Sequence, residues 1–112
     1  MREQYELVFQ KRSIDGYGVL PFVFQKVEGG SNSALLFIGK LNRFEIESLI
    51  YDLDQSLIDG QNFDELFLSD SIEDITITIA YDYPNVIINN LLIISMQNLK
   101  RLLNEWNHYI SL

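Results

Sequence analysis

The first part of the chain alternates between apolar and polar side chains, which is the period of a β-strand with one buried face. This alternation covers residues 3–10 and is followed by the turn dipeptide Asp15-Gly16. A second strand is predicted over 17–27, which is rich in aromatic and β-branched residues. Pro21 interrupts it and has no N–H to donate, so this strand is expected at a sheet edge or with a bulge.

Later segments predict three further strands. The apolar run Ala34–Ile38, which follows a glycine-containing loop, predicts a short and fully buried third strand. The clearest strand of the chain is predicted over 72–81, where isoleucine alternates with threonine. A turn over 82–85 leads to a fifth strand from Val86, which Asn89-Asn90 is expected to split in two or to bend with a bulge.

Two helices are predicted from apolar spacing and from the residues that begin and end them. Asn42 and Glu45 have the spacing of a capping box, and Gly60 suits a C-terminal stop. Between them, apolar side chains recur at helical spacing: Ile46, Leu49, Ile50, Leu53 and Leu57. Ser95 suits the N-cap of the second helix, whose apolar stripe comprises Met96, Leu99, Leu102, Leu103, Trp106 and Ile110.

These elements predict an α+β fold in one domain, residues 1–112, with the order strand-strand-strand-helix-strand-strand-helix. Short connections and hairpin turns favour a two-layer sandwich, in which an antiparallel five-stranded sheet carries both helices on one face. Residues 61–71 are expected to form a long acidic loop that apolar side chains tie to the core: Phe63, Leu66, Phe67 and Leu68.

Composition indicates the cellular compartment of the protein and excludes several kinds of cysteine-dependent site. The chain has 112 residues and no cysteine, which excludes disulfides, thiolate zinc sites and a cysteine nucleophile, and which fits a reducing cytoplasm. Its first residues lack the apolar core of a signal peptide, and its apolar runs are far too short to span a bilayer. We therefore expect a cytoplasmic protein without a membrane partner.

Charge is concentrated in one window. Ten of the 16 acidic residues lie between Glu45 and Asp74, where there is no Lys, Arg or His, so the net charge of −8 belongs to this window. Carboxylates at this density repel one another and destabilise the folded state, so their concentration in one window suggests a function. A sequence pI of about 4.4 argues against direct binding of nucleic acid, because phosphate contacts need clustered Lys and Arg. It disfavours anionic membrane surfaces in the same way.

No residue set predicts a catalytic or metal centre. Asp52-Leu53-Asp54 resembles the start of a calcium loop, but Leu57 stands where such a loop needs glycine. His108 is the only histidine, and neither a nucleophile elbow nor a phosphate-binding loop is present. We expect no catalytic residue, no metal and no cofactor. A small enzyme that uses a pair of carboxylates is a third-ranked alternative.

The C-terminal residues resemble those of a known group of bacterial proteins. Ile94-Ser95 followed by Leu99, Leu102-Leu103 and Trp106 resembles the ending "IS…L..LL..W" of many small bacterial immunity proteins, the inhibitors of contact-dependent inhibition toxins and other polymorphic toxins. Length, acidity, absence of cysteine and the order of elements are similar too. The resemblance implies a cytoplasmic, non-enzymatic protein that binds one cognate toxin domain, and many such toxins are nucleases with basic clefts.

Together, the resemblance and the acidic window predict a surface that meets a basic toxin domain, with carboxylates in place of phosphates and aromatic anchors such as Tyr51. The expected partner-binding residues are Asp52, Asp54, Asp59, Phe63, Asp64, Glu65, Phe67, Asp70, Glu73 and Asp74. Two other interpretations stay open. The window is only a solvated helix face and loop, or the chain is an acidic secretion chaperone or adaptor module. The expected oligomeric state is a monomer or weak homodimer.

Overall fold

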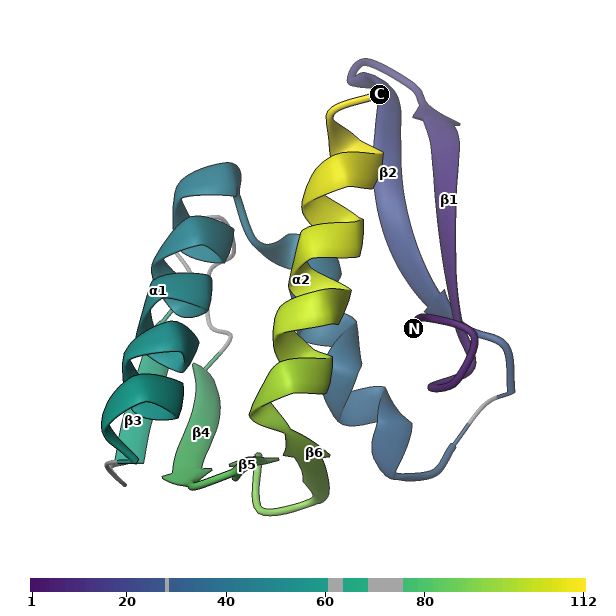
Figure 1. Ribbon diagram of the computed structural model, residues 1–112. Coiled ribbons are helices and arrows are strands. Elements are labelled where there is room, and N and C mark those ends of the chain that lie inside the picture. The colour runs from purple at the N-terminus through teal and green to yellow at the C-terminus, as the bar shows by residue number, and fades with distance from the viewer. Residues whose placement is uncertain (28, 61–63, 69–75) are drawn as a thin grey trace.

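The computed structural model describes residues 1–27, 29–60, 64–68 and 76–112, with 64–68 described by their backbone (Figure 1). Its elements, in chain order, are β1 (Leu7–Ile14), β2 (Gly18–Gln25), the 3₁₀-helix η1 (Ser31–Lys40), α1 (Arg43–Asp59), β3 (Asp64–Leu68), β4 (Thr76–Asp82), β5 (Asn85–Ile88), β6 (Leu92–Ser95) and α2 (Met96–Ile110).

The strands form two antiparallel sheets, so the predicted single five-stranded sheet with two helices on one face is wrong, although the fold is α+β. β1 and β2 pair only with each other, while β4, β5 and β6 form a second sheet to which β3 adds next to β4. Helix α2 lies between the β1–β2 hairpin and α1 (Figure 1), and it contacts α1, η1 and β6. The hairpin is therefore separated from the second sheet by a helix.

The main error is the predicted third strand, Ala34–Ile38, which lies inside η1. Ala34, Leu35, Phe37 and Ile38 are all buried. A fully apolar run has no period of its own to favour a strand over a helix. Packing decided the conformation: η1 covers β2 on one side and contacts α2 and β6 on the other. Without a third strand, no described strand pairs the hairpin with the second sheet, and η1 connects them by side-chain packing instead.

Strand boundaries differ at three other places. The first strand begins at Leu7, because residues 1–6 form turns in which the Gln4 N–H donates to the Met1 carbonyl at 3.1 Å. Within the expected acidic loop 61–71, β3 runs from Asp64 to Leu68 and pairs with β4. The strand predicted over 72–81 is β4, and its residues 72–75 lie outside the described part of the chain.

Most local signals are confirmed. Asn42 Oδ1 accepts from the Glu45 N–H at 2.8 Å and the Asn42 N–H donates to Glu45 Oε1 at 2.9 Å, a complete capping box. Gly60 ends α1 in the left-handed region, with φ 66°. Ser95 caps α2 by accepting from the Asn98 N–H at 3.0 Å. The expected split of the last strand occurs at Asn89-Asn90, where both residues have φ 54°.

Pro21 also lies where its chemistry requires. It pairs with Lys11 in an unbroken register. A two-stranded sheet has only edge strands, so the missing N–H removes no interior ladder bond. The edge placement is confirmed, without a bulge at this position.

The core is built around α2. Its stripe from Met96 to Trp106 is buried against α1, η1 and β6, and on the hairpin side Trp106 makes an edge-on contact with Phe9 at 4.9 Å between ring centroids. Tyr109 stacks on Trp106 at 5.7 Å and completes an aromatic cluster with Phe9. The sheet contributes alternate residues from its inner face: Ile77, Ile79, Tyr81, Val86, Ile88, Leu92 and Ile94.

Close packing of η1 on β2 makes Gly39 a sensitive position. A Cβ at Gly39 would lie 2.8 Å from Val23 Cγ2 and 3.1 Å from the Val23 backbone nitrogen. We expect Gly39→Ala to destabilise the fold by about 1–3 kcal/mol, because the backbone of β2 has to shift. Urea unfolding measures this change. Ala substitution at exposed Ser31, also in η1, is the control, and equal midpoints for the two variants would contradict the close approach.

The capping box gives a second stability prediction. Asn42→Ala removes the acceptor for the Glu45 N–H and is expected to cost about 1 kcal/mol of unfolding free energy. Asn42→Ser retains an acceptor and should cost less than half of that. Both values come from the same urea titration, and indistinguishable variants would show that the cap adds nothing to stability.

Candidate protein-binding surface

The acidic residues predicted on the helix occupy different environments along α1. Asp52 and Asp54 are half-buried and Asp59 is exposed. Asp54 Oδ1 lies 2.6 Å from Lys100 Nζ on α2, so this carboxylate already has a partner within the chain. Asp54 therefore helps to join α1 to α2, and it is the weakest member of the predicted surface.

The remaining predicted residues follow the end of α1. Asp64, Glu65 and Phe67 lie on β3, the strand at the end of the second sheet, where Asp64 is in register with Ala80 and Phe67 with Ile77. Four more lie outside the described part of the chain: Phe63, Asp70, Glu73 and Asp74. The C-terminal end of α1 at Asp59 is thus followed, after four intervening residues, by an edge strand that begins with two acidic residues. Charged residues on an edge strand also discourage pairing between sheets of different molecules.

Most of the described charge in this window has no counterion. Glu45 is buried in the capping box and Asp54 is paired with Lys100. Glu47, Asp52 and Asp59 have no ion pair with any described residue. The acidic character of α1 is therefore a property of its surface that packing within the chain leaves uncompensated.

Basic side chains of the N-terminal part are engaged elsewhere. Arg2 lies 4.7 Å from the centroid of the Phe9 ring, Lys11 lies 5.4 Å from that of Tyr109, and Arg12 lies 4.3 Å from that of Phe24. These cation–π contacts hold the cations on the hairpin and its interface with α2. These three cations therefore lie away from the acidic window of α1 and β3.

The exposed face of α1 also carries three large apolar side chains. Phe44 is 79% exposed, Tyr51 63% and Ile58 76%. They are spaced by seven residues, and positions seven apart fall on nearly the same line along a helix. Of these three residues, only Tyr51 was predicted from the sequence as an anchor. The sequence could have indicated Phe44 and Ile58 too, because apolar residues seven positions apart that lie outside the core-facing stripe of a helix form an exposed apolar line.

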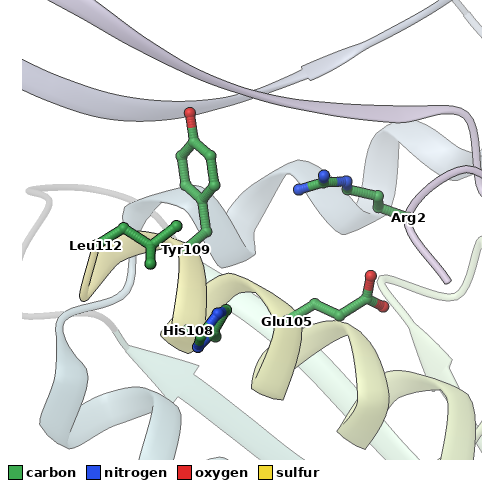
Figure 2. A pocket seen from close by; sticks show the side chains of 5 residues that line it. All are labelled: Arg2, Glu105, His108, Tyr109 and Leu112. Carbon is green, nitrogen blue, oxygen red and sulfur yellow. The ribbon is translucent and has the colours of Figure 1, made fainter.

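A pocket beside α2 collects the residue types most often used in catalysis. It has a volume of about 210 Å³ and is lined by Arg2, Glu105, His108, Tyr109 and Leu112 (Figure 2). The His108 ring points away from Arg2, and Tyr109 is stacked on Trp106. The pocket holds no nucleophile next to a base, so its arrangement does not support a reaction.

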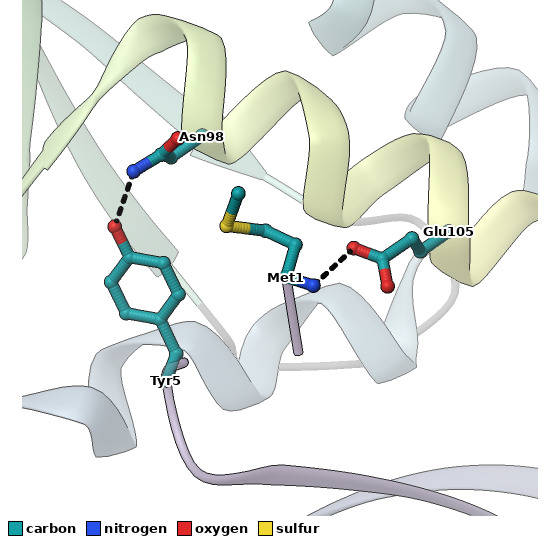
Figure 3. Close-up of polar contacts among 4 residues, drawn as sticks. All are labelled: Met1, Tyr5, Asn98 and Glu105. Atoms are coloured by element: carbon teal, nitrogen blue, oxygen red, sulfur yellow. Dashed lines mark hydrogen bonds and ion pairs between the residues drawn. The ribbon is translucent and has the colours of Figure 1, made fainter. Parts of the chain in front are cut away.

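Glu105 in this pocket has a structural partner. Its Oε2 lies 3.4 Å from the Met1 amino group, and the Tyr5 hydroxyl accepts from Asn98 Nδ2 at 2.9 Å (Figure 3). Both contacts attach residues 1–6 to α2. The polar groups here hold the N-terminal segment in place.

The described residues contain neither a metal-binding cluster nor a helix suited to span a membrane. No group of three or more His, Asp or Glu side chains in these ranges is placed to hold a metal ion. Within the same ranges, no helix has the length and apolar character needed to cross a membrane.

Comparison with known proteins leaves the chain without a relative that would assign its function. It matches no protein-family model, and no curated protein or solved structure is significantly similar to it. The resemblance to immunity proteins therefore stays a prediction from the sequence, based on the C-terminal residues and on length, acidity and the absence of cysteine.

Proposed function

We propose that this chain is a cytoplasmic, non-enzymatic immunity protein that binds a cognate bacterial toxin domain and blocks it. The toxin surface would be basic, as in the active-site cleft of a nuclease. The observation that carries the proposal is the charge of the window Glu45–Asp74, which holds ten acidic residues and no base. Among them, Glu47, Asp52 and Asp59 have no ion pair with a described residue.

Electrostatics explains how such a surface would act. A nuclease cleft is positive because its substrate is a polyanion, and carboxylates from α1 and β3 would occupy it in place of phosphates. Attraction between the two surfaces raises the association rate by about 10- to 1,000-fold and falls with ionic strength. Fast capture suits an inhibitor that has to act before its toxin finds a substrate.

The end of α1 and the start of β3 are where we place the contact. Asp59 is the last residue of α1, and Asp64 and Glu65 begin the edge strand that follows. Asp54 is left out of the contact because Lys100 neutralises it. The contact proposed from the structure is therefore smaller than the window defined by sequence.

The first test is functional and uses a candidate toxin domain taken from a neighbouring gene. Co-expression of the chain with that domain in a sensitive bacterium should restore growth, and the two purified proteins should form a stable complex. Absence of both rescue and binding would exclude that domain as the target and remove the support for the immunity assignment.

The second test locates the contact by charge removal. The triple variant Asp59→Asn, Asp64→Asn, Glu65→Gln should slow association with the toxin domain by about 10-fold or more at low salt and flatten its salt dependence. Stopped-flow mixing at several salt concentrations measures both effects. Folding should be unharmed, because removal of like charges relieves self-repulsion.

A matched variant controls for net charge. Glu3→Gln, Glu6→Gln and Asp15→Asn also remove three carboxylates, all exposed and all in the N-terminal part of the chain. The control should change the association rate much less than the triple variant does. Equal effects of the two variants would mean that only total charge matters and would place the toxin contact elsewhere.

A further inference from the structure

The described part of the chain contains the dipeptide Asp-Gly twice, at Asp15-Gly16 and at Asp59-Gly60. Aspartate before glycine is prone to isomerise, because glycine has no side chain to hinder attack of its nitrogen on the preceding carboxyl group. All four residues are exposed. A Cβ built at either glycine would meet no neighbouring atom within 4 Å. The two sites therefore share their chemistry and their access to solvent, and they differ in backbone structure.

Asp15 and Gly16 are the two central residues of the turn between β1 and β2. The Tyr17 N–H donates to the Ile14 carbonyl at 3.0 Å, which closes the turn, and Gly16 has φ 83°. A positive φ at the third residue of such a turn is the geometry of type II. The peptide group between Asp15 and Gly16 lies at the centre of this turn. Its N–H has no backbone acceptor among the described residues.

This central peptide group can rotate while the hydrogen bond that closes the turn stays intact. Type I and type II turns differ by such a rotation, through ψ of the second residue and φ of the third. One direction of rotation carries ψ of Asp15 through angles at which the Gly16 nitrogen faces the Asp15 carboxyl group. No described residue forms an ion pair that would hold this carboxylate elsewhere. The reactive arrangement is therefore accessible without unfolding of the hairpin.

The second Asp-Gly pair is held in place by the end of a helix. Asp59 is the last residue of α1, and the Gly60 N–H donates to the Ser56 carbonyl at 2.7 Å. This bond directs the Gly60 nitrogen along the helix and away from the Asp59 carboxyl group. Rotation of the Asp59–Gly60 peptide group would break the bond and disrupt the left-handed cap at Gly60. The reaction at this site therefore requires local unfolding of the helix end.

We propose that Asp15-Gly16 is a site of spontaneous isoaspartate formation in the folded protein, and that the C-cap of α1 protects Asp59-Gly60 from the same reaction. The Gly16 nitrogen bonds to Cγ of Asp15, and its proton leaves with the carboxyl hydroxyl as one water molecule. Water then opens the succinimide ring. Cleavage at Cγ restores aspartate, whereas cleavage of the original bond between the Asp15 carbonyl carbon and the Gly16 nitrogen leaves the main chain running through Cβ.

The product changes the turn and leaves the charge of the protein as it was. Isoaspartate lengthens the main chain by one methylene group and retains a free carboxylate, so the net charge stays −8. Figure 1 shows the turn at the end of the hairpin, away from the C-terminal end of α1 and from β3. We therefore expect the fold to tolerate the change. The inference goes beyond the proposed function and does not depend on it.

Peptide mapping of the aged protein tests the first site. The purified chain is kept folded for several weeks in mildly acidic buffer, because a protonated carboxyl group loses water more readily than a carboxylate. Trypsin then releases residues 13–26, in which Asp15 is the only aspartate. Reversed-phase chromatography and electron-transfer fragmentation should detect an isoaspartyl form of this peptide that increases with time. Its formation should be slower in mildly alkaline buffer.

The second site is the matched control within the same molecule. Chymotrypsin releases Asp59-Gly60 in a short peptide, because it cleaves after Leu57 and Phe63. Isoaspartate at Asp15 should exceed that at Asp59 by about 10-fold. This factor corresponds to about 1.4 kcal/mol, which is within the net value of one backbone hydrogen bond.

Two further samples separate local chemistry from the effect of the fold. The same chain unfolded in urea has neither the turn nor the helix cap, so its two sites should isomerise at similar rates. Asp15→Glu should abolish the modified form of peptide 13–26, because glutamate would have to close a larger ring, and should leave Asp59 unchanged.

Three outcomes would overturn the proposal. The first is an unmodified peptide 13–26 from the folded chain after an incubation that converts the unfolded chain. The second is equal accumulation of isoaspartate at Asp15 and Asp59 in the folded chain. The third is a rate at Asp59 that is the same in folded and unfolded protein, which would show that the helix cap gives no protection.

Discussion

The structure depends on the burial of α2 from several sides at once. Leu99, Leu102 and Leu103 are fully buried, and Trp106 is buried with its ring edge against Phe9 of the hairpin. Since α1, η1, β6 and the hairpin all contact this helix or its aromatic cluster, it takes the place that a central strand would have in a single-sheet sandwich. Substitution of several residues in its apolar stripe would therefore remove the packing partner of several elements at once.

That arrangement determines where the charges lie. Cations of the N-terminal part are held on aromatic rings around the junction of the hairpin with α2. The stripe of α1 that enters the core includes Ile46, Leu49 and Leu53, and the opposite face turns outward with its carboxylates. Only Lys100 of α2 reaches across to this helix as a described ion-pair partner, at Asp54. The acidic window is therefore separated from the cations of the N-terminal part, which makes it available to other molecules.

The exposed face of α1 combines two properties that have different uses. Its carboxylates act over a distance and favour rapid encounter with a basic surface, whereas Phe44, Tyr51 and Ile58 act only in contact. The proposed inhibition of a toxin depends on the first of these properties.

Local chemistry by itself determined both long helices, their capping residues, the hairpin turns and the strand alternation of Ile77, Ile79 and Tyr81, because each depends on neighbours a few residues away. The run Ala34–Ile38 is different, because five apolar residues fit a buried strand and a buried helix equally well, and packing against β2, α2 and β6 decided for the helix. That one element decided between one sheet and two. The sequence likewise determined that charge is concentrated between Glu45 and Asp74. Only the tertiary structure decided that Lys100 neutralises Asp54 and that Phe44 and Ile58 stay in solvent, because both facts depend on which face of α1 meets α2.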